Sequence, residues 1–216
     1  MRLPYLLAAT LTALVVLAGC DNPGDQIARV VDPEMAELAK VQAMDRPAAA
    51  AHVPQCRIRE EGCARVHEIT GDACLRMAQD RLASGGAAPY AACAAARFGV
   101  LRNAGVLGTS LRGLEAERLL RETASRAEAN EANMRLAALA ALAAGVDHPA
   151  AGYYRASAVD WQAAFAGPVP CAALQEAQGH ARQAAAAGPA EGLDNRAAAA
   201  TLANRLSQRN QAGGCT

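Results

Sequence analysis

The sequence predicts an all-α protein in which antiparallel helical hairpins form a bundle or a short α-solenoid stapled by disulfides. Alanine, which has the highest helix propensity, is the most common residue, whereas aromatic residues make up 3% of the chain. Several segments carry apolar residues at helical spacing. Glycine and proline separate these segments, and no segment shows the alternating pattern of a strand.

The composition limits the class of protein and of partner. The 216 residues suit one domain. Basic and acidic residues number 21 each, and the basic residues are scattered along the chain. Because no net field attracts a polyanion, we expect no nucleic-acid partner. Alanine buries little apolar area per residue, so we also expect a thin core.

The beginning of the chain resembles a targeting segment. Arg2 provides a positive charge and residues 6–18 are apolar, which is typical of a secretory signal peptide. The apolar stretch is too short to span a bilayer comfortably. It ends in Leu17-Ala18-Gly19-Cys20, which resembles the lipobox of bacterial lipoproteins. The alternatives are an ordinary signal peptide with a chance cysteine and a short buried helix.

The lipobox resemblance implies a location. In that family, signal peptidase II would remove residues 1–19, and Cys20 would carry a diacylglyceryl group on its thiol and usually an acyl chain, such as palmitate, on its amino group. More than one acyl chain is needed for stable anchoring, at about 0.8 kcal/mol per buried methylene. We therefore expect a lipid-anchored protein of the bacterial cell envelope that faces the periplasm. Asp21 resembles the residue that retains lipoproteins in the inner membrane of enteric bacteria, but this rule varies, so inner and outer membrane both stay open.

Residues 20–55 are expected to form a lipidated tether with one short helix. Asp32-Pro33 suits the start of this helix, and Arg46-Pro47 is expected to end it. The sequence AAAAHVPQ at residues 48–55 is typical of a spacer. Two apolar residues of the helix are expected to dock on the folded domain, the alternative being that they wait for a partner: Met35 and Leu38.

Residues 56–216 are expected to form the helical domain. Its first helix is predicted over residues 57–68, and the second begins near Thr70, which suits a helix start. Gly85-Gly86 ends the second helix, because glycine readily adopts the left-handed conformation that follows a helix. The first two helices are therefore predicted to form a pair around Thr70.

The middle of the domain begins with a helix at Pro89, because proline fits the first helical turn, and this helix ends near Gly105. Thr109 or Ser110 caps the next helical pattern, which continues to Ala144 without a clear break. Such a length is unusual for a globular helix. A bend is therefore expected near one of two asparagines, Asn130 or Asn133.

The last three helices have clearer limits. His148-Pro149 starts one helix and Gly167-Pro168 ends it. Another helix is predicted over residues 171–187, and Asp194 caps the last one, which ends near Asn210. The apolar stripes that predict the core are Leu75, Ala78 and Leu82; Leu174, Ala177, Ala181 and Ala184; and Ala199, Leu202 and Leu206.

One stretch resembles a tetratricopeptide repeat, a family of helical hairpins. Four residues fall where that family has small residues, a turn glycine and a packing aromatic: Ala138, Gly145, Ala150 and Tyr154. Gln162 replaces the closing proline of that pattern, and no period of about 34 residues is clear. The resemblance implies helical hairpins and nothing more specific.

Six cysteines remain besides the lipobox cysteine, and their even number together with export to an oxidising envelope predicts disulfides. Cys171 opens one expected helix and Cys215 follows the next, so an antiparallel hairpin would pair them. If the first expected helix is straight, Cys56 and Cys63 are about 10 Å apart along it and cannot pair. Cys63 and Cys74 lie at similar distances from the turn expected near Thr70, so these two are expected to pair. Cys56 is then left to pair with Cys93.

No catalytic residue, metal site or cofactor is expected. Cys63 and His67 stand one helical turn apart, but no spacing among the remaining His and Cys residues resembles a zinc pattern. We therefore expect Cys63 in a disulfide and His67 on a helix surface. Asp147 and His148 are suited to acid–base chemistry, but they precede Pro149, where a polar helix start is the ordinary expectation. The sequence has neither a phosphate-binding glycine-rich loop nor a G-x-S-x-G motif.

The segment YYRASAVDWQAAF at residues 153–165 contains four of the seven aromatic residues of the chain. Tyr154, Ala158, Trp161 and Phe165 share one helix face. Two interpretations stay open, the densest part of the core and a protein-binding ridge, because Trp, Tyr and Arg dominate interface hot spots. The protein-binding candidates are Tyr153, Tyr154, Arg155, Trp161 and Phe165.

Together these features predict a noncatalytic accessory or assembly factor, which binds an envelope or secreted protein at the periplasmic face of a membrane. The alternative is a periplasmic inhibitor or immunity protein against an exported toxin, a role that small disulfide-stabilised lipoproteins suit. An enzyme acting on envelope polymers is a third hypothesis. It requires Asp, Glu or His residues from different helices to converge in a cleft.

Overall fold

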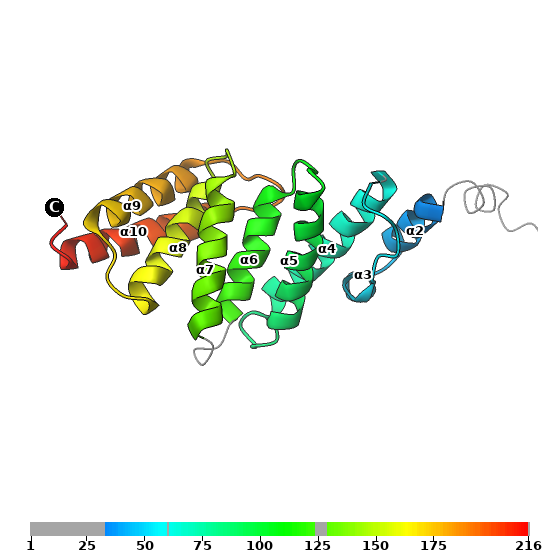
Figure 1. Ribbon diagram of the computed structural model, residues 1–216, viewed down its shortest axis with the longest axis horizontal. Coiled ribbons are helices and arrows are strands. Elements are labelled where there is room, and N and C mark those ends of the chain that lie inside the picture. Colours follow the sequence, from blue (N-terminus) through cyan, green and yellow to red (C-terminus); the bar gives the residue numbers. More distant parts are fainter. Residues whose placement is uncertain (1–32, 60, 124–128, 216) are drawn as a thin grey trace, which may run out of the picture.

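The computed structural model describes residues 33–59, 61–123 and 129–215, and these are all-helical, as predicted (Figure 1). The only strand-like feature in these ranges is an isolated bridge between Ala190 and Leu193. The helices are α2 (Pro33–Gln42), α3 (Arg46–Ala51), α4 (Glu61–Arg81), α5 (Ala88–Asn103), α6 (Ser110–Thr123), α7 (Ala129–Ala144), α8 (Ala151–Phe165), α9 (Cys171–Ala186) and α10 (Arg196–Ala212).

The helices from α4 to α10 form a short α-solenoid. Each packs against the next one along the chain, and Figure 1 shows them as a row in chain order. Alternate helices also touch, since α4 contacts α6, α6 contacts α8 and α8 contacts α10. The even-numbered helices therefore make one layer, and α5, α7 and α9 make the other. Packing between near neighbours in a row is the solenoid alternative rather than the closed bundle.

The predicted apolar stripes form the core of this solenoid. All ten stripe residues are buried except Leu82, which is partly buried and packs against the core cluster of α4, α5 and α6. Many of the buried side chains are alanines, including Ala177 and Ala181 of α9, neither of which exposes more than 1% of its surface. The core is therefore thin in apolar volume, as the composition predicts.

The segment before α4 packs on the helical domain, because α2 and α3 both contact α4. Val41 of α2 is buried, while Met35 is 47% exposed and Leu38 is partly buried. The expectation of a spacer at residues 48–55 is wrong for its first half, which lies in α3. Asp45 accepts a hydrogen bond from the Ala48 N–H and caps α3. Arg46-Pro47, which is expected from the sequence to end a helix, instead lies in the first turn of α3.

Helix α4 runs through the break that the sequence predicts near Thr70. The Thr70 hydroxyl donates to the Val66 carbonyl at 2.9 Å, so it bonds within the helix instead of capping a new one. The next residue is a glycine, Gly71, because α5 lies close to the backbone of α4 at this position. A Cβ atom on Gly71 would lie 3.1 Å from Arg97 Cβ and 3.2 Å from Phe98 Cζ. The glycine therefore allows two helices to approach, and it marks no turn.

The continuous helix corrects two of the three predicted disulfides. Cys63 and Cys74 both lie on α4, eleven residues apart, which is about 16 Å and beyond the reach of a disulfide. Cys56 precedes α4 and folds back to pair with Cys63, with Cα atoms 5.5 Å apart. Cys74 pairs with Cys93 of α5 at a Cα distance of 5.9 Å. The predicted Cys171–Cys215 pair is confirmed, with Cα atoms 5.2 Å apart.

The long helical pattern predicted to end at Ala144 is also divided. Figure 1 shows α6 and α7 as antiparallel neighbours, so the bend expected near Asn130 or Asn133 is replaced by a full reversal of the chain before α7. The connecting residues 124–128 lie outside the described residues. The limits predicted for α5, α8, α9 and α10 agree with the structure to within a few residues.

Helices α8 and α9 approach closely at Gly152. A Cβ atom on Gly152 would lie 2.5 Å from the backbone oxygen of His180, so the two helices would have to move apart. Gly152→Ala is therefore expected to lower the free energy of unfolding, measured by urea denaturation, by about 2 kcal/mol. The control is Gly179→Ala in α9, where a Cβ meets nothing within 4 Å and alanine favours the helix by about 1 kcal/mol. Equal stability of the two variants would contradict this helix contact.

Candidate protein-binding surface

Three of the five predicted binding residues serve the fold. Tyr154 is fully buried, and its hydroxyl accepts a hydrogen bond from Asn195 Nδ2 at 2.8 Å. Arg155 donates to the carbonyls of Ala143 and Val146, both at 2.9 Å, and so caps the carboxyl end of α7. Tyr153 is partly buried and packs its ring edge against the Tyr154 ring.

The other two residues reach the surface at the carboxyl end of α8. Trp161 is partly buried and Phe165, one helical turn later, is 54% exposed. Their ring centroids are 5.0 Å apart, within the range of favourable aromatic pairs. The predicted aromatic stripe therefore divides into two parts. Tyr154 and Ala158 belong to the core, whereas Trp161 and Phe165 form an aromatic surface pair.

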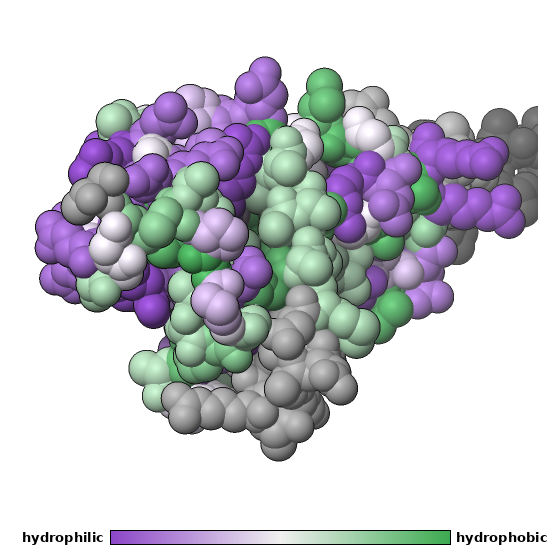
Figure 2. Space-filling view, turned by 60° about the vertical axis from the view of Figure 1, so that its left-hand side comes forward, coloured by the Kyte–Doolittle hydropathy of each residue, from purple (hydrophilic) through white to green (hydrophobic). Residues whose placement is uncertain are grey.

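From residue 134 onward, helix α7, which precedes α8 in the same hairpin, exposes mainly small apolar residues. Arg135 is the only charged residue of α7 from residue 134 onward, and it is partly buried. Exposed faces of helices are normally charged or polar, so a face of small apolar residues is unusual. Figure 2 shows a band of hydrophobic colour in the middle of the molecule, next to the hydrophilic surface at the left. The exposed residues of α7 in this range are Met134, Ala137, Ala138, Ala140, Ala141 and Ala144.

The two features lie on one helical hairpin. The connection joins Ala144 to Ala151, so residues equally far from it along α7 and α8 lie at the same level. Met134, which is 67% exposed, is therefore level with Trp161. The exposed residues of α7 together with Trp161 and Phe165 are named the apolar face below.

Arg121 of α6 lies against the Trp161 ring, and no pattern in the sequence singled it out. It is 5% exposed, and its guanidinium carbon lies 4.2 Å from the centroid of the Trp161 ring. This distance is that of a cation–π contact. Burial lowers the pKa of Arg121 from its usual value. The apolar face therefore contains a buried positive charge next to its aromatic residues.

A separate groove of about 530 Å³ brings together polar residues of the α7–α8 connection, α8 and α9: Asp147, His148, Arg155 and His180 among others. It is the cleft in which the enzyme hypothesis would place its chemistry. His148 Nδ1 accepts a hydrogen bond from the Ala150 N–H at 3.1 Å, and Asp147 is exposed. These two residues have the arrangement of the polar helix start expected before Pro149.

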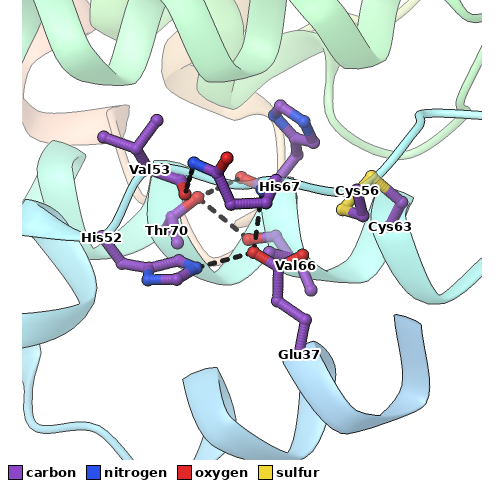
Figure 3. Close-up of a disulfide and its surroundings, with 9 residues drawn as sticks. Glu37, His52, Val53, Cys56, Cys63, Val66, His67 and Thr70 are labelled. Atoms are coloured by element: carbon purple, nitrogen blue, oxygen red, sulfur yellow. Dashed lines mark hydrogen bonds and ion pairs between the residues drawn. A yellow bond between two sulfur atoms is a disulfide. The ribbon is translucent and has the colours of Figure 1, made fainter. Parts of the chain in front are cut away.

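The region of Cys63 and His67 holds α2 and α3 on α4 (Figure 3). Glu37 accepts hydrogen bonds from His52 Nε2 at 2.8 Å and from the Gln55 N–H at 2.9 Å. Burial alone would raise the pKa of Glu37, but these bonds lower it. His67 was expected on a helix surface, but it is 7% exposed, and burial lowers its pKa. No group of three His, Cys, Asp or Glu residues in the described chain is arranged to hold a metal ion.

No protein-family model, curated protein or solved structure gives a significant match to this chain. None of the helices within the described residues combines the length and hydropathy needed to cross a membrane. Cys20 and the predicted signal segment lie outside the described residues.

Proposed function

We propose that this protein is a lipid-anchored envelope lipoprotein that binds another protein through its apolar face, as a noncatalytic accessory or assembly factor. The small apolar residues that α7 exposes from Met134 onward, together with the aromatic pair Trp161 and Phe165 on the next helix of the same hairpin, carry the proposal. Soluble proteins rarely leave a contiguous apolar helix face open to water, and such faces mark interaction sites. The partner is an envelope or secreted protein.

The aromatic pair Trp161 and Phe165 is the expected hot spot of this surface. Trp is among the residues most enriched at interface hot spots, and hot spots lie in positions that become fully desolvated in the complex. Trp161 is already partly buried and packed against Phe165 and Arg121, so it is held in place before binding. Such preorganisation reduces the entropy that is lost on association.

The anchor is part of the same proposal. The Leu17-Ala18-Gly19-Cys20 sequence would place diacylglycerol on Cys20, and 12 residues separate this cysteine from the first residue of α2, Pro33. An extended chain covers at most about 3.5 Å per residue, so the helical domain would stay within about 45 Å of the lipid surface. The partner would then be bound close to the membrane.

The anchor and the surface are tested together by affinity capture from detergent-solubilised envelopes. Before solubilisation, wild-type protein is expected to be in the membrane fraction and to take up a lipid label, whereas Cys20→Ala is expected to lose the label. After solubilisation, wild-type protein is expected to retain a partner. Trp161→Ala is expected to weaken partner binding about thirtyfold, which corresponds to about 2 kcal/mol for a hot spot. The control is Gln208→Ala, an exposed residue of α10. Equal partner recovery with Trp161→Ala and Gln208→Ala would contradict the proposed surface.

A further inference from the structure

Arg121 is buried and has no carboxylate partner among the described residues. Its Nε has no hydrogen-bond partner in the part of the chain that the structure describes. Its guanidinium packs on the Trp161 ring. The neighbouring Arg118 on the same helix differs sharply. Arg118 forms ion pairs with Glu115, at 2.8 Å, and with Glu122. Among the described residues, Arg112 and Arg118 of α6 both have carboxylate partners, whereas Arg121 has none.

An arginine in this environment is costly for the isolated protein. Burying a charge without a counterion or full hydrogen bonding carries a large desolvation penalty, and arginine stays charged in proteins. The Trp161 ring offsets part of this penalty, because cation–π contacts are stronger when they are desolvated. The planar N–H edge of the guanidinium, which is suited to a carboxylate, is not used fully within the described chain.

We infer that Arg121 receives a carboxylate from the bound partner, from an Asp or Glu that lies beside an apolar side chain in the partner sequence. The apolar side chain would pack on Trp161 and Phe165, and the carboxylate would meet the guanidinium at the edge of the Trp161 ring. This inference rests on the proposed function and adds the chemistry of the partner.

The charge distribution favours an acidic peptide segment over other anions. One buried arginine among apolar side chains offers a single positive charge, whereas polyanions bind through several arginines or lysines in a row. The apolar surroundings also require an apolar group next to the anion. A partner segment that alternates acidic with aromatic or aliphatic residues satisfies both requirements.

The test uses peptides selected from a random phage-displayed library on the full mature protein in detergent. Trp161 is the only tryptophan of the chain, so its fluorescence reports binding at this site. The selected peptides are expected to share an Asp or Glu next to an apolar residue and to change the fluorescence. Replacing that acid by its amide is expected to weaken binding at least tenfold to wild-type protein and to have no effect on Arg121→Gln. Arg182→Gln, an exposed arginine of α9, is the matched control and should behave as wild type.

The outcomes separate this inference from the proposed function. Peptides that bind through Trp161 but contain no acid, or an acid-to-amide effect that persists in Arg121→Gln, would overturn the inference and leave the proposed surface standing. If no selected peptide changes Trp161 fluorescence, both fail. Should Arg121→Gln fold poorly, the comparison of acid and amide peptides on the wild-type protein still decides whether the site prefers a carboxylate.

Discussion

Replacing Tyr154 by alanine is expected to lower the free energy of unfolding by about 4 kcal/mol. Tyr154 is the largest fully buried side chain of the described residues and packs with Leu111, Leu114 and Leu139 from α6 and α7. These leucines are held within packed helices and can relax only partly into the cavity that the missing ring would leave. The measurement is urea denaturation followed by circular dichroism at 222 nm, the usual helix signal.

Two variants serve as controls for Tyr154→Ala. Tyr154→Phe keeps the ring and removes the hydroxyl that accepts from Asn195, so a loss of about 1 kcal/mol is expected. Trp161→Ala removes a partly exposed ring and is expected to cost clearly less stability than Tyr154→Ala, while it weakens partner binding about thirtyfold. The opposite order, with Trp161 more important for stability than Tyr154, would contradict the division of the aromatic stripe into core and surface.

Removing the Cys171–Cys215 disulfide with a double serine substitution is expected to destabilise the oxidised protein by about 4 kcal/mol. The two cysteines are separated by 44 residues, and in the chain-entropy model the stabilisation grows with the length of the closed loop. The α9–α10 hairpin needs this constraint because its buried side chains are mainly small, with Leu174, Leu202 and Leu206 among alanines.

The Cys56–Cys63 disulfide provides the matched comparison. Its cysteines are separated by 7 residues, so the same model gives about 2 kcal/mol for its removal. Denaturation of the two double-serine variants under oxidising conditions measures the difference. A larger loss for the short loop than for the long one would contradict the expected order. Mass spectrometry of peptides from the unreduced protein should recover the Cys56–Cys63 and Cys74–Cys93 pairs rather than Cys63–Cys74.

Helix content and core stripes were predictable from sequence because they depend on local properties. Alanine propensity and the spacing of Leu174, Ala177 and Ala181 act within a single helix, and the hairpin that joins Cys171 to Cys215 follows from two such helices. The errors arose where the identity of a residue is explained by its contact with a neighbouring helix. A break between helices is predicted near Thr70, but the chain is helical there, and the adjacent Gly71 allows the close approach of Phe98. That misplaced break then gave the wrong disulfide pairs.

In the candidate site, too, local features were predictable from the sequence and features that depend on packing were not. The cluster of aromatic residues identified α8, and Trp161 and Phe165 are indeed at the surface. Sequence alone could not separate them from Tyr154, because which part of a stripe is covered depends on the length of the neighbouring helices. Arg121 was not predicted at all. Its significance comes from its burial under Trp161 and from the absence of a described counterion, and both are properties of the packed structure.

The apolar face as a protein-binding surface is tested most directly by site-specific photocrosslinking in native envelopes. A photoreactive phenylalanine analogue is placed at Phe165 or Ala138 on the apolar face, and at Gln208 on the exposed side of α10 as the control. The two positions on the apolar face are expected to give the same discrete crosslinked protein, and the control position is expected to give none. Crosslinking to no protein from the apolar face, or equal crosslinking from Gln208, would contradict the proposed function.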